Sequence, residues 1–152
     1  MIHYLRREQW IPAPLKNVWE YFANPENLNE LTPPDMNFLI VAGGDRTMYE
    51  GQMIEYRVEF MRGIRSLWLT EISHVRQGEY FVDEQRMGPY RLWIHEHLFV
   101  PSRNGVLMND LVTYAVPFDL LGDVVNAFWI HRRLMRIFDY RTRKIAQLFG
   151  EG

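Results

Sequence analysis

Six short runs of alternating apolar and polar residues between positions 36 and 116 constrain the fold of this chain more than any other feature. Alternation with a period of two is typical of β-strands that bury one face. The runs are MNFLIVA, GQMIEYRVEFM, IRSLWLTEISHV, EYFVDEQR, YRLWIHEHLFVP and GVLMNDLVTYAV. Residue pairs that favour tight turns separate them: Gly43-Gly44, Arg62-Gly63, Gln77-Gly78, Gly88-Pro89 and Asn104-Gly105. Short strands spaced in this way predict an antiparallel meander.

Helical patterns lie on both sides of these strands. Residues 2–11 (IHYLRREQWI) predict a first strand, and apolar residues at helical spacing follow in a short helix that begins near Pro14. Asn24-Pro25 is typical of the cap and first position of a second short helix. A long helix is predicted from residue 123 to 149, with an apolar stripe through Ala127, Leu134, Phe138, Ile145 and Leu148. We therefore expect residues 1–152 to form one α+β domain with about seven strands and a long C-terminal helix.

Composition excludes several kinds of site and partner. The chain has no cysteine, which excludes disulfides, thiolate nucleophiles and zinc–thiolate sites. Its net charge of −2 gives no overall reason to expect nucleic acid. The longest uncharged run, residues 36–44, is far too short to cross a bilayer, and Arg6, Arg7 and Glu8 stand where a signal peptide would be apolar. We therefore expect a cytoplasmic protein without membrane insertion.

The predicted C-terminal helix is the one strongly basic segment. Six cations lie close together in it, opposed by Asp139 alone: Arg132, Arg133, Arg136, Arg141, Arg143 and Lys144. Phosphate, RNA or anionic lipid would fit this charge. A solvated outer face is the interpretation that we favour, because no aromatic residues alternate with the cations to stack on single-stranded bases. His131 differs from its basic neighbours, since it falls on the apolar stripe and is expected to face the interior.

One face of the predicted sheet carries too many polar groups for a plain core. Trp93, His95, His97 and Phe99 alternate onto that face, and a hairpin at Asn104-Gly105 sets Trp93 beside Tyr114 and His97 beside Asp110. On the preceding strands, Asp83 and Gln85 alternate with Phe81, and Trp68 with Thr70, in the same way. Each buried polar group needs a partner, whereas a roomy cavity tolerates a few of them among apolar walls. The pattern therefore predicts a pocket.

The order of these elements resembles the START-like superfamily, which includes polyketide cyclases/dehydrases, lipid-transfer domains and the birch-pollen allergen group. The stretches that carry the resemblance are IPAPLKNVWEYFANPENLNELTPP, FVDEQRMGPYRLWIHEHLFVP, MNDLVTYAVPF and RIFDYR, and bacterial single-domain members are the most similar. The resemblance implies a helix-grip fold, in which a curved antiparallel sheet wraps the long C-terminal helix and leaves a cavity. It also implies a hydrophobic or aromatic, lipid- or polyketide-like small molecule as the ligand, and no cofactor. The predicted ligand-binding residues are Trp68, Phe81, Asp83, Gln85, Trp93, His95, His97, Asp110, Tyr114, His131, Leu134 and Phe138.

Three interpretations of His95 and His97 stay open at this point. Two imidazoles on one strand face could bind a metal with Asp83 or Asp110, but they form only half a site and the superfamily is not generally metal-dependent, so no metal is predicted. His97 with Asp110 could instead act as an acid–base pair in a cyclase/dehydrase-type enzyme. In the third interpretation, which we favour, His97 and Asp110 form a buried pair that braces the sheet while His95 and Gln85 recognise the ligand's polar end. Whether the chain is an enzyme is left undecided.

The opposite face of the predicted sheet is unusually apolar. Leu92, Ile94, Leu98, Leu107 and Leu111 point away from the pocket, at positions that are commonly charged or polar in the resembling proteins. A cluster of large aliphatic side chains in water more often marks an interface than the surface of a monomer. The sequence therefore predicts a homodimer through the outer face of the sheet.

Overall fold

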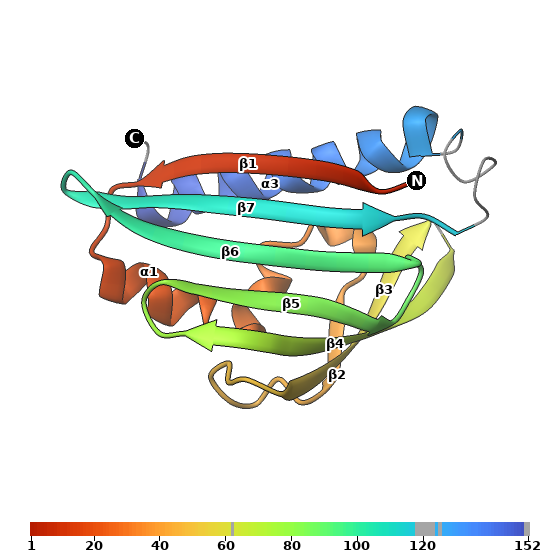
Figure 1. Cartoon of the computed structure of the whole chain (residues 1–152), viewed down its shortest axis with the longest axis horizontal. Coiled ribbons are helices and arrows are strands. Elements are labelled where there is room, and N and C mark those ends of the chain that lie inside the picture. The colour runs from red at the N-terminus through yellow and green to blue at the C-terminus, as the bar shows by residue number, and fades with distance from the viewer. Residues whose placement is uncertain (62, 118–123, 125, 151–152) are drawn as a thin grey trace.

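A seven-stranded antiparallel sheet bends around the C-terminal helix in the computed structural model, which describes residues 1–61, 63–117, 124 and 126–150 (Figure 1). The strand order is β1-β7-β6-β5-β4-β3-β2, so the first and second strands lie at opposite edges. The strands are β1 (His3–Ile11), β2 (Leu39–Ala42), β3 (Gln52–Met61), β4 (Ile64–Arg76), β5 (Tyr80–Met87), β6 (Leu92–Ser102) and β7 (Gly105–Ala115). This arrangement confirms the predicted helix-grip fold.

Three short helical segments carry the chain from one edge of the sheet to the other. They are α1 (Leu15–Phe22) and the 3-10 turns η1 (Pro25–Asn29) and η2 (Pro34–Met36). The Asn24 side chain accepts a hydrogen bond from the Glu26 amide at 3.1 Å, as a cap does, but the predicted second helix forms only a 3-10 turn. The strand expected to begin at Met36 begins at Leu39, because Met36 belongs to η2 and Asn37 is left-handed with φ 42°.

The C-terminal helix α3 (His131–Phe149) lies along the inner face of the sheet (Figure 1). Leu134, Phe138 and Ile145 are buried at helical spacing, whereas Leu148 is 39% exposed and does not belong to the predicted stripe. A π-helical turn, η3 (Asn126–Ile130), precedes α3, so the predicted uninterrupted α-helix does not form there. Residue 123, where that helix was predicted to begin, and the side chain of Ala127 lie outside the described part of the chain. No helix among the described residues is long and apolar enough to cross a membrane.

The hairpin between β6 and β7 sets the register of the predicted pocket face. Ser102 pairs with Gly105 across a two-residue loop, and from there Trp93 lies opposite Tyr114 and His97 opposite Asp110. The register predicted from the sequence is thereby confirmed. Glycine is required at position 105, because a Cβ atom there would lie 2.2 Å from the backbone oxygen of Ile11 on β1.

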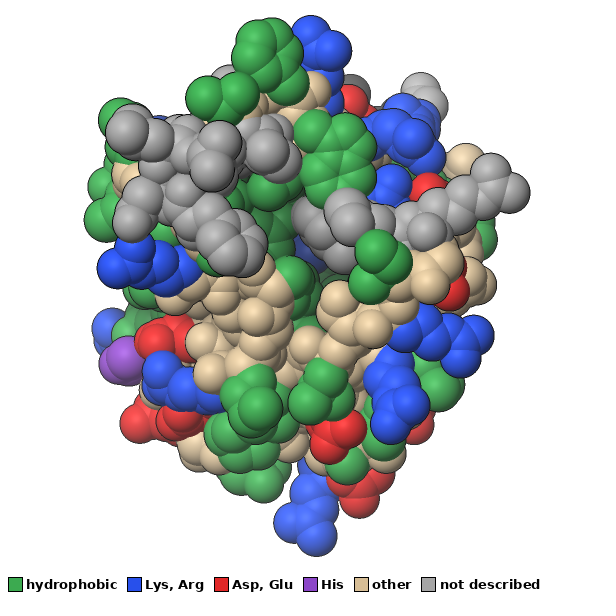
Figure 2. Space-filling model, turned by 90° about the vertical axis from the view of Figure 1, so that its right-hand side faces the viewer, with side chains coloured by type: hydrophobic (Ala, Val, Ile, Leu, Met, Phe, Trp, Pro, Cys, Tyr) green, Lys and Arg blue, Asp and Glu red, His purple; other side chains and the backbone are tan. Residues whose placement is uncertain are grey.

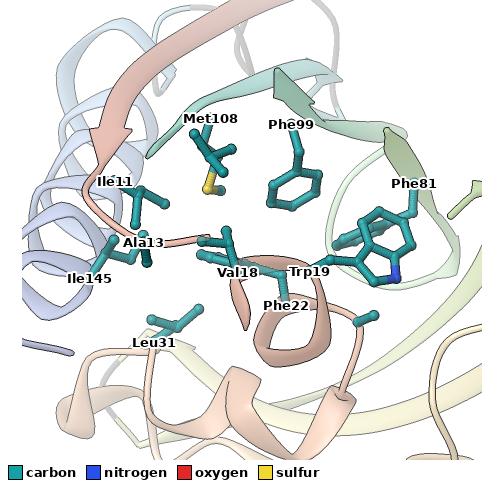
Figure 3. Close-up of a cluster of buried hydrophobic side chains, with 12 residues drawn as sticks. Ile11, Ala13, Val18, Trp19, Phe22, Leu31, Phe81, Phe99, Met108 and Ile145 are labelled. Atoms are coloured by element: carbon teal, nitrogen blue, oxygen red, sulfur yellow. The ribbon is translucent and has the colours of Figure 1, made fainter. Parts of the chain in front are cut away.

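One cluster of buried hydrophobic side chains lies where α1 covers the sheet (Figure 3). The Trp19 ring from α1 packs edge-on against Phe81 of β5 and Phe99 of β6, at centroid distances of 6.0 and 5.5 Å. Phe22 adds a contact of 5.5 Å with the same Phe99 ring, and Ile145 of α3 completes the cluster. Burial of these large apolar surfaces fixes α1 against one end of the sheet.

Candidate functional site

A cavity of about 160 Å³ lies between the inner face of the sheet and α3, and η1 and η2 close its third side. Most of its wall is apolar or aromatic and consists of Tyr21, Phe22, Leu28, Leu31, Met36, Phe38, Met48, Tyr56, Val58, Trp68, Ile72, Phe81, Trp93, Leu134, Ile137 and Phe138. Its polar side chains are Asn24, Asn27, Thr32, Thr70, Asp83, His95, His97 and Arg141. The end of the molecule where β3 meets β4 is hollowed, with hydrophobic side chains visible inside (Figure 2).

Two histidines and two aspartates form a compact polar cluster in the sheet side of this wall. Asp83 on β5 lies opposite His95, and Asp110 on β7 lies opposite His97, so each carboxylate flanks both imidazoles. The Oδ1 atom of Asp110 lies 2.9 Å from His95 Nε2 and 3.0 Å from His97 Nδ1. The Oδ2 atom of Asp83 lies 2.8 Å from His97 Nε2 and 3.5 Å from His95 Nδ1. The two aspartates thus hold the imidazole rings side by side, 3.7 Å apart.

Arg141 completes the cluster from α3 and corrects a sequence-based expectation. We expected it on the solvated outer face of the helix, but it is only 7% exposed and it lines the cavity. Its Nη2 atom lies 3.3 Å from His97 Nδ1 and 3.7 Å from Asp110 Oδ1, and its guanidinium carbon lies 5.4 Å from the centre of the Phe22 ring. A buried guanidinium needs such partners, because an unpaired charge in the interior is very costly.

Most of the other cations of α3 form ion pairs with the segment that joins β1 to β2 (residues 12–38, the crossing segment). They do not form a free basic surface. Arg133 and Arg136 both contact Asp35 of η2, at 3.7 and 3.2 Å, and Lys144 lies 3.3 Å from Glu30. Arg132 and Arg143 are exposed, as expected for a solvated face. The basic segment therefore serves in large part to tie the crossing segment to the helix.

The charges in the cluster balance one another. Burial by itself would raise the pKa of Asp110, but the Arg141 guanidinium and the hydrogen bonds from the two histidines outweigh burial and hold this pKa well below its usual range. Burial would likewise raise the pKa of Asp83, and the neighbouring histidines outweigh it and lower that pKa. Burial lowers the pKa of His95, whereas at His97 the hydrogen bonds to both aspartates overcome burial and raise the pKa. The two aspartates thus favour the protonated form of His97 more than that of His95.

Most of the predicted ligand-binding residues meet at the cavity. Those that line it are Trp68, Phe81, Asp83, Trp93, His95, His97, Leu134 and Phe138. Asp110 lies behind the two imidazoles and does not form part of the wall, although it contacts both of them. The predicted pair His97 and Asp110 is thus present, while Asp83 is the carboxylate of the cluster that borders the cavity.

Three further predicted residues lie away from the cavity wall. The Gln85 amide donates to the backbone oxygen of Tyr90 at 2.6 Å and accepts from the Tyr90 amide at 3.2 Å, so it fastens the turn at Gly88-Pro89. Tyr114 is fully buried in the core, and its hydroxyl lies 3.3 Å from Nδ1 of His131 on α3. These two residues connect the sheet to the helix behind the wall.

Sequence reasoning missed the part of the wall that the crossing segment supplies. Asn24, Asn27, Leu28 and Thr32 reach the cavity from η1 and its flanks. Their only sequence signal was the concentration of asparagine, leucine and proline after α1, which indicated a short helix without showing which way it would face. Thr70 of β4, which the sequence placed on the same face as Trp68 without including it among the ligand-binding residues, also lines the cavity.

Comparisons with known proteins bear on the fold. No protein-family model matches the sequence, and no curated protein matches it. Among solved structures, the Zhui aromatase/cyclase from a Streptomyces species aligns with a TM-score of 0.76 and 12% identity over 97% of this chain and 93% of that one. Ginseng major latex-like protein 151 from Panax ginseng gives 0.71 and 12% over 98% of both chains, and a START superfamily protein from Mycobacterium smegmatis gives 0.70 and 13% over 96% and 99%.

Proposed function

We propose that this chain, which has the START-like fold, binds a hydrophobic or aromatic small molecule in the cavity between its sheet and α3. The observation that carries the proposal is a cavity whose mostly apolar wall has one compact group of ionisable side chains. Small-molecule sites commonly combine apolar walls with a few convergent polar groups that orient the ligand. The fold is shared with an aromatase/cyclase and a START superfamily protein, which is consistent with this class of ligand.

The size and polarity of the cavity sharpen the proposal. A dry cavity of about 150 Å³ admits a molecule the size of benzene, so the space here holds at least one aromatic ring. Arg141 supplies the donor for a polar end, since its buried Nε atom has no hydrogen-bond partner and the side chain lines the cavity. A buried donor without a partner favours a ligand that carries a carbonyl or carboxylate oxygen.

Titration with the apolar fluorescent probe N-phenyl-1-naphthylamine tests the proposal. We expect about micromolar affinity, and we expect Leu134→Trp to weaken binding at least tenfold by filling the cavity while the protein stays folded. Leu98→Trp, the same change on the outer face, is the matched control and should leave binding unchanged. If the probe does not bind and Leu134→Trp unfolds the protein, the interior is a solid core and the proposal fails.

A second experiment addresses the polar end of the ligand. Native mass spectrometry of the purified chain, followed by extraction, would identify what co-purifies with it. Arg141→Leu should weaken binding of an acid-bearing aromatic compound such as naphthoic acid more than that of naphthalene, whereas Arg143→Leu, on the exposed side of the same helix, should change neither. Equal effects of Arg141→Leu on both compounds would remove Arg141 from ligand recognition.

Acid–base catalysis of the cyclase/dehydrase type is the second candidate function. The observation that favours it is the contact of His97 with two carboxylates in a cavity wall, because a histidine paired in this way has a controlled tautomer and can move a proton. The predicted pair is His97 with Asp110. His97→Gln should then retain probe binding but abolish turnover of a polyketide-like substrate, whereas equal loss of both would assign His97 to binding or structure.

The remaining proposals concern the domain organisation, location and partners of the protein. We infer that residues 1–152 act as one ligand-binding domain in the cytoplasm, without nucleic acid as a partner. The aliphatic residues of the outer face of the sheet are half-buried or exposed, and Leu98 is 38% exposed. They favour a homodimer through this face, because a contiguous apolar surface gains by leaving water.

A further inference from the structure

Three side chains of the polar cluster place potential metal-ligand atoms close together at the cavity wall. These atoms are a carboxylate oxygen of Asp83 and one ring nitrogen each of His95 and His97, and all lie within 4.8 Å of one another. The Oδ2 atom of Asp83 is 2.8 Å from His97 Nε2 and 3.5 Å from His95 Nδ1. Nitrogen and oxygen ligands bind a transition metal at roughly 2.0–2.2 Å, which places neighbouring ligand atoms about 3 Å apart. The two distances from Asp83 Oδ2 are thus already near the spacing that a shared ion requires.

The opposite nitrogens of the same two imidazoles provide a second, independent observation. His95 Nε2 and His97 Nδ1 both lie within 3.0 Å of Asp110 Oδ1, and Asp110 does not line the cavity. Histidines that bind metals almost always donate their other N–H to a carboxylate or carbonyl, which fixes the tautomer and the ring orientation. A single buried carboxylate performs this for both rings here. Arg141 balances the charge of Asp110, so Asp83 contributes the carboxylate charge on the cavity side.

We propose that Asp83, His95 and His97 bind a divalent first-row transition metal ion, with Asp110 as the residue that positions both imidazoles. Two imidazoles and one carboxylate form a donor set that suits Zn²⁺ or Fe²⁺ and leaves further coordination positions open. Those positions face the cavity, because all three ligand residues line it. From the sequence, two histidines on one strand are half a site, and the fold adds the third donor from β5. The site goes beyond the proposed function, since the apolar wall can bind a ligand without a metal.

Co²⁺ titration of the chelator-treated full chain tests the site through a readout other than activity. We expect one equivalent of Co²⁺ to produce the ligand-field absorption of a protein-bound ion, and one equivalent of Zn²⁺ to remove it. Asp83→Asn and His95→Gln should each weaken binding at least 100-fold. Asp110→Asn should weaken it about 10- to 100-fold, as loss of an orienting partner does. His74→Gln removes an exposed histidine outside the cluster and should leave binding unchanged.

Two results would overturn the proposal. One is a folded wild-type chain that binds no stoichiometric Co²⁺, and the other is binding that survives Asp83→Asn but disappears in His74→Gln. Thermal unfolding shows which variants are folded, and Asp83→Asn keeps the test decisive if Asp110→Asn fails to fold. Naphthylamine binding to metal-free protein separates the two proposals. Probe binding without a metal site rejects the metal alone, whereas a metal site without probe binding rejects the hydrophobic ligand alone.

Discussion

The same three strands, β5, β6 and β7, build two very different regions along their inner face. At one end, Phe99 and Met108 pack with Val18 and Trp19 of α1 in an apolar core, and Phe81 lies between this core and the cavity, which it also lines (Figure 3). A few residues along the strands, the wall carries the His and Asp cluster and borders a cavity. The alternation of the strands continues through both regions: on β6, for example, every second residue from Trp93 to Phe99 points inward.

The difference lies in what covers the sheet. The helix α1 has full turns and directs Val18, Trp19 and Phe22 onto the strands. The 3-10 turns η1 and η2 span only five and three residues, so they cover the sheet without filling the space beneath them. Leu28 of η1 and Met36 of η2 border this space without filling it, and here polar groups on the strands are tolerated.

The largest expected effect contrasts a side chain from each region. Phe99→Ala should cost about 3–5 kcal/mol in the free energy of unfolding, because it empties a closely packed site. Phe38→Ala, at the cavity wall, should cost about 1–2 kcal/mol, since part of its ring already faces open space. Urea denaturation measures both. Equal losses would mean that the cavity region is packed as tightly as the core.

The two carboxylates of the cluster offer the next contrast. Asp110→Asn should destabilise the protein by about 3 kcal/mol, because it leaves the buried Arg141 charge without its carboxylate. Asp83 borders the cavity with its side chain 19% exposed, so Asp83→Asn should cost about 1 kcal/mol. The two isosteric variants act as controls for each other. A larger loss for Asp83→Asn would place the essential charge pair on the cavity side.

Gln85 tests whether a residue beside the cavity contributes to stability alone or also to ligand binding. Gln85→Ala removes two hydrogen bonds to the Tyr90 backbone and should cost about 1–2 kcal/mol, measured by thermal unfolding. Affinity for N-phenyl-1-naphthylamine should not change, because Gln85 does not line the cavity. Weaker probe binding at unchanged stability would restore Gln85 to the ligand site.

The outer face of the sheet should give the smallest effect on folding. Leu92→Glu with Ile94→Lys should change stability by less than about 1 kcal/mol while dissociating the proposed homodimer. Sedimentation velocity over a range of concentrations reports the association. A wild-type chain that sediments as a monomer at high concentration, indistinguishable from the double variant, would eliminate this interface.

Strand register was predictable, and side-chain environment was only partly so. The hairpin at Asn104-Gly105 and the strict alternation of β6 fixed the pairing of His97 with Asp110, because a slip by one residue would have turned Trp93 and Phe99 outward. Gln85 alternates in the same way, but the register shifts between β4 and β5 and the nearby turn give it another partner. Alternation cannot report such local irregularities.

The helix and the crossing segment explain the rest of what sequence reasoning missed. Arg141 falls at helical spacing between Phe138 and Ile145, so the apolar stripe of the helix could have indicated its burial. Its partners Asp110 and Phe22 could not have been found in this way, nor could the cavity residues Asn24 and Asn27, which depend on the path of η1 across the sheet. These partners and this path are set by contacts between segments far apart in the chain, which no local pattern contains.

The position of β1 at the edge beside β7 has a consequence for how the chain folds as it is synthesised. Arg6 reaches Asn109 on β7, 103 residues away, and Arg7 reaches Asp139 on α3, 132 residues away. β1 therefore finds its hydrogen-bonding neighbour only after β7 has been synthesised, and α3 follows β7 in the chain. Pairings of such long range are slow to form and leave apolar surface and strand edges open meanwhile. Until α3 packs against the sheet, the apolar inner face of the strands stays open, and this interval favours aggregation of the partly folded chain.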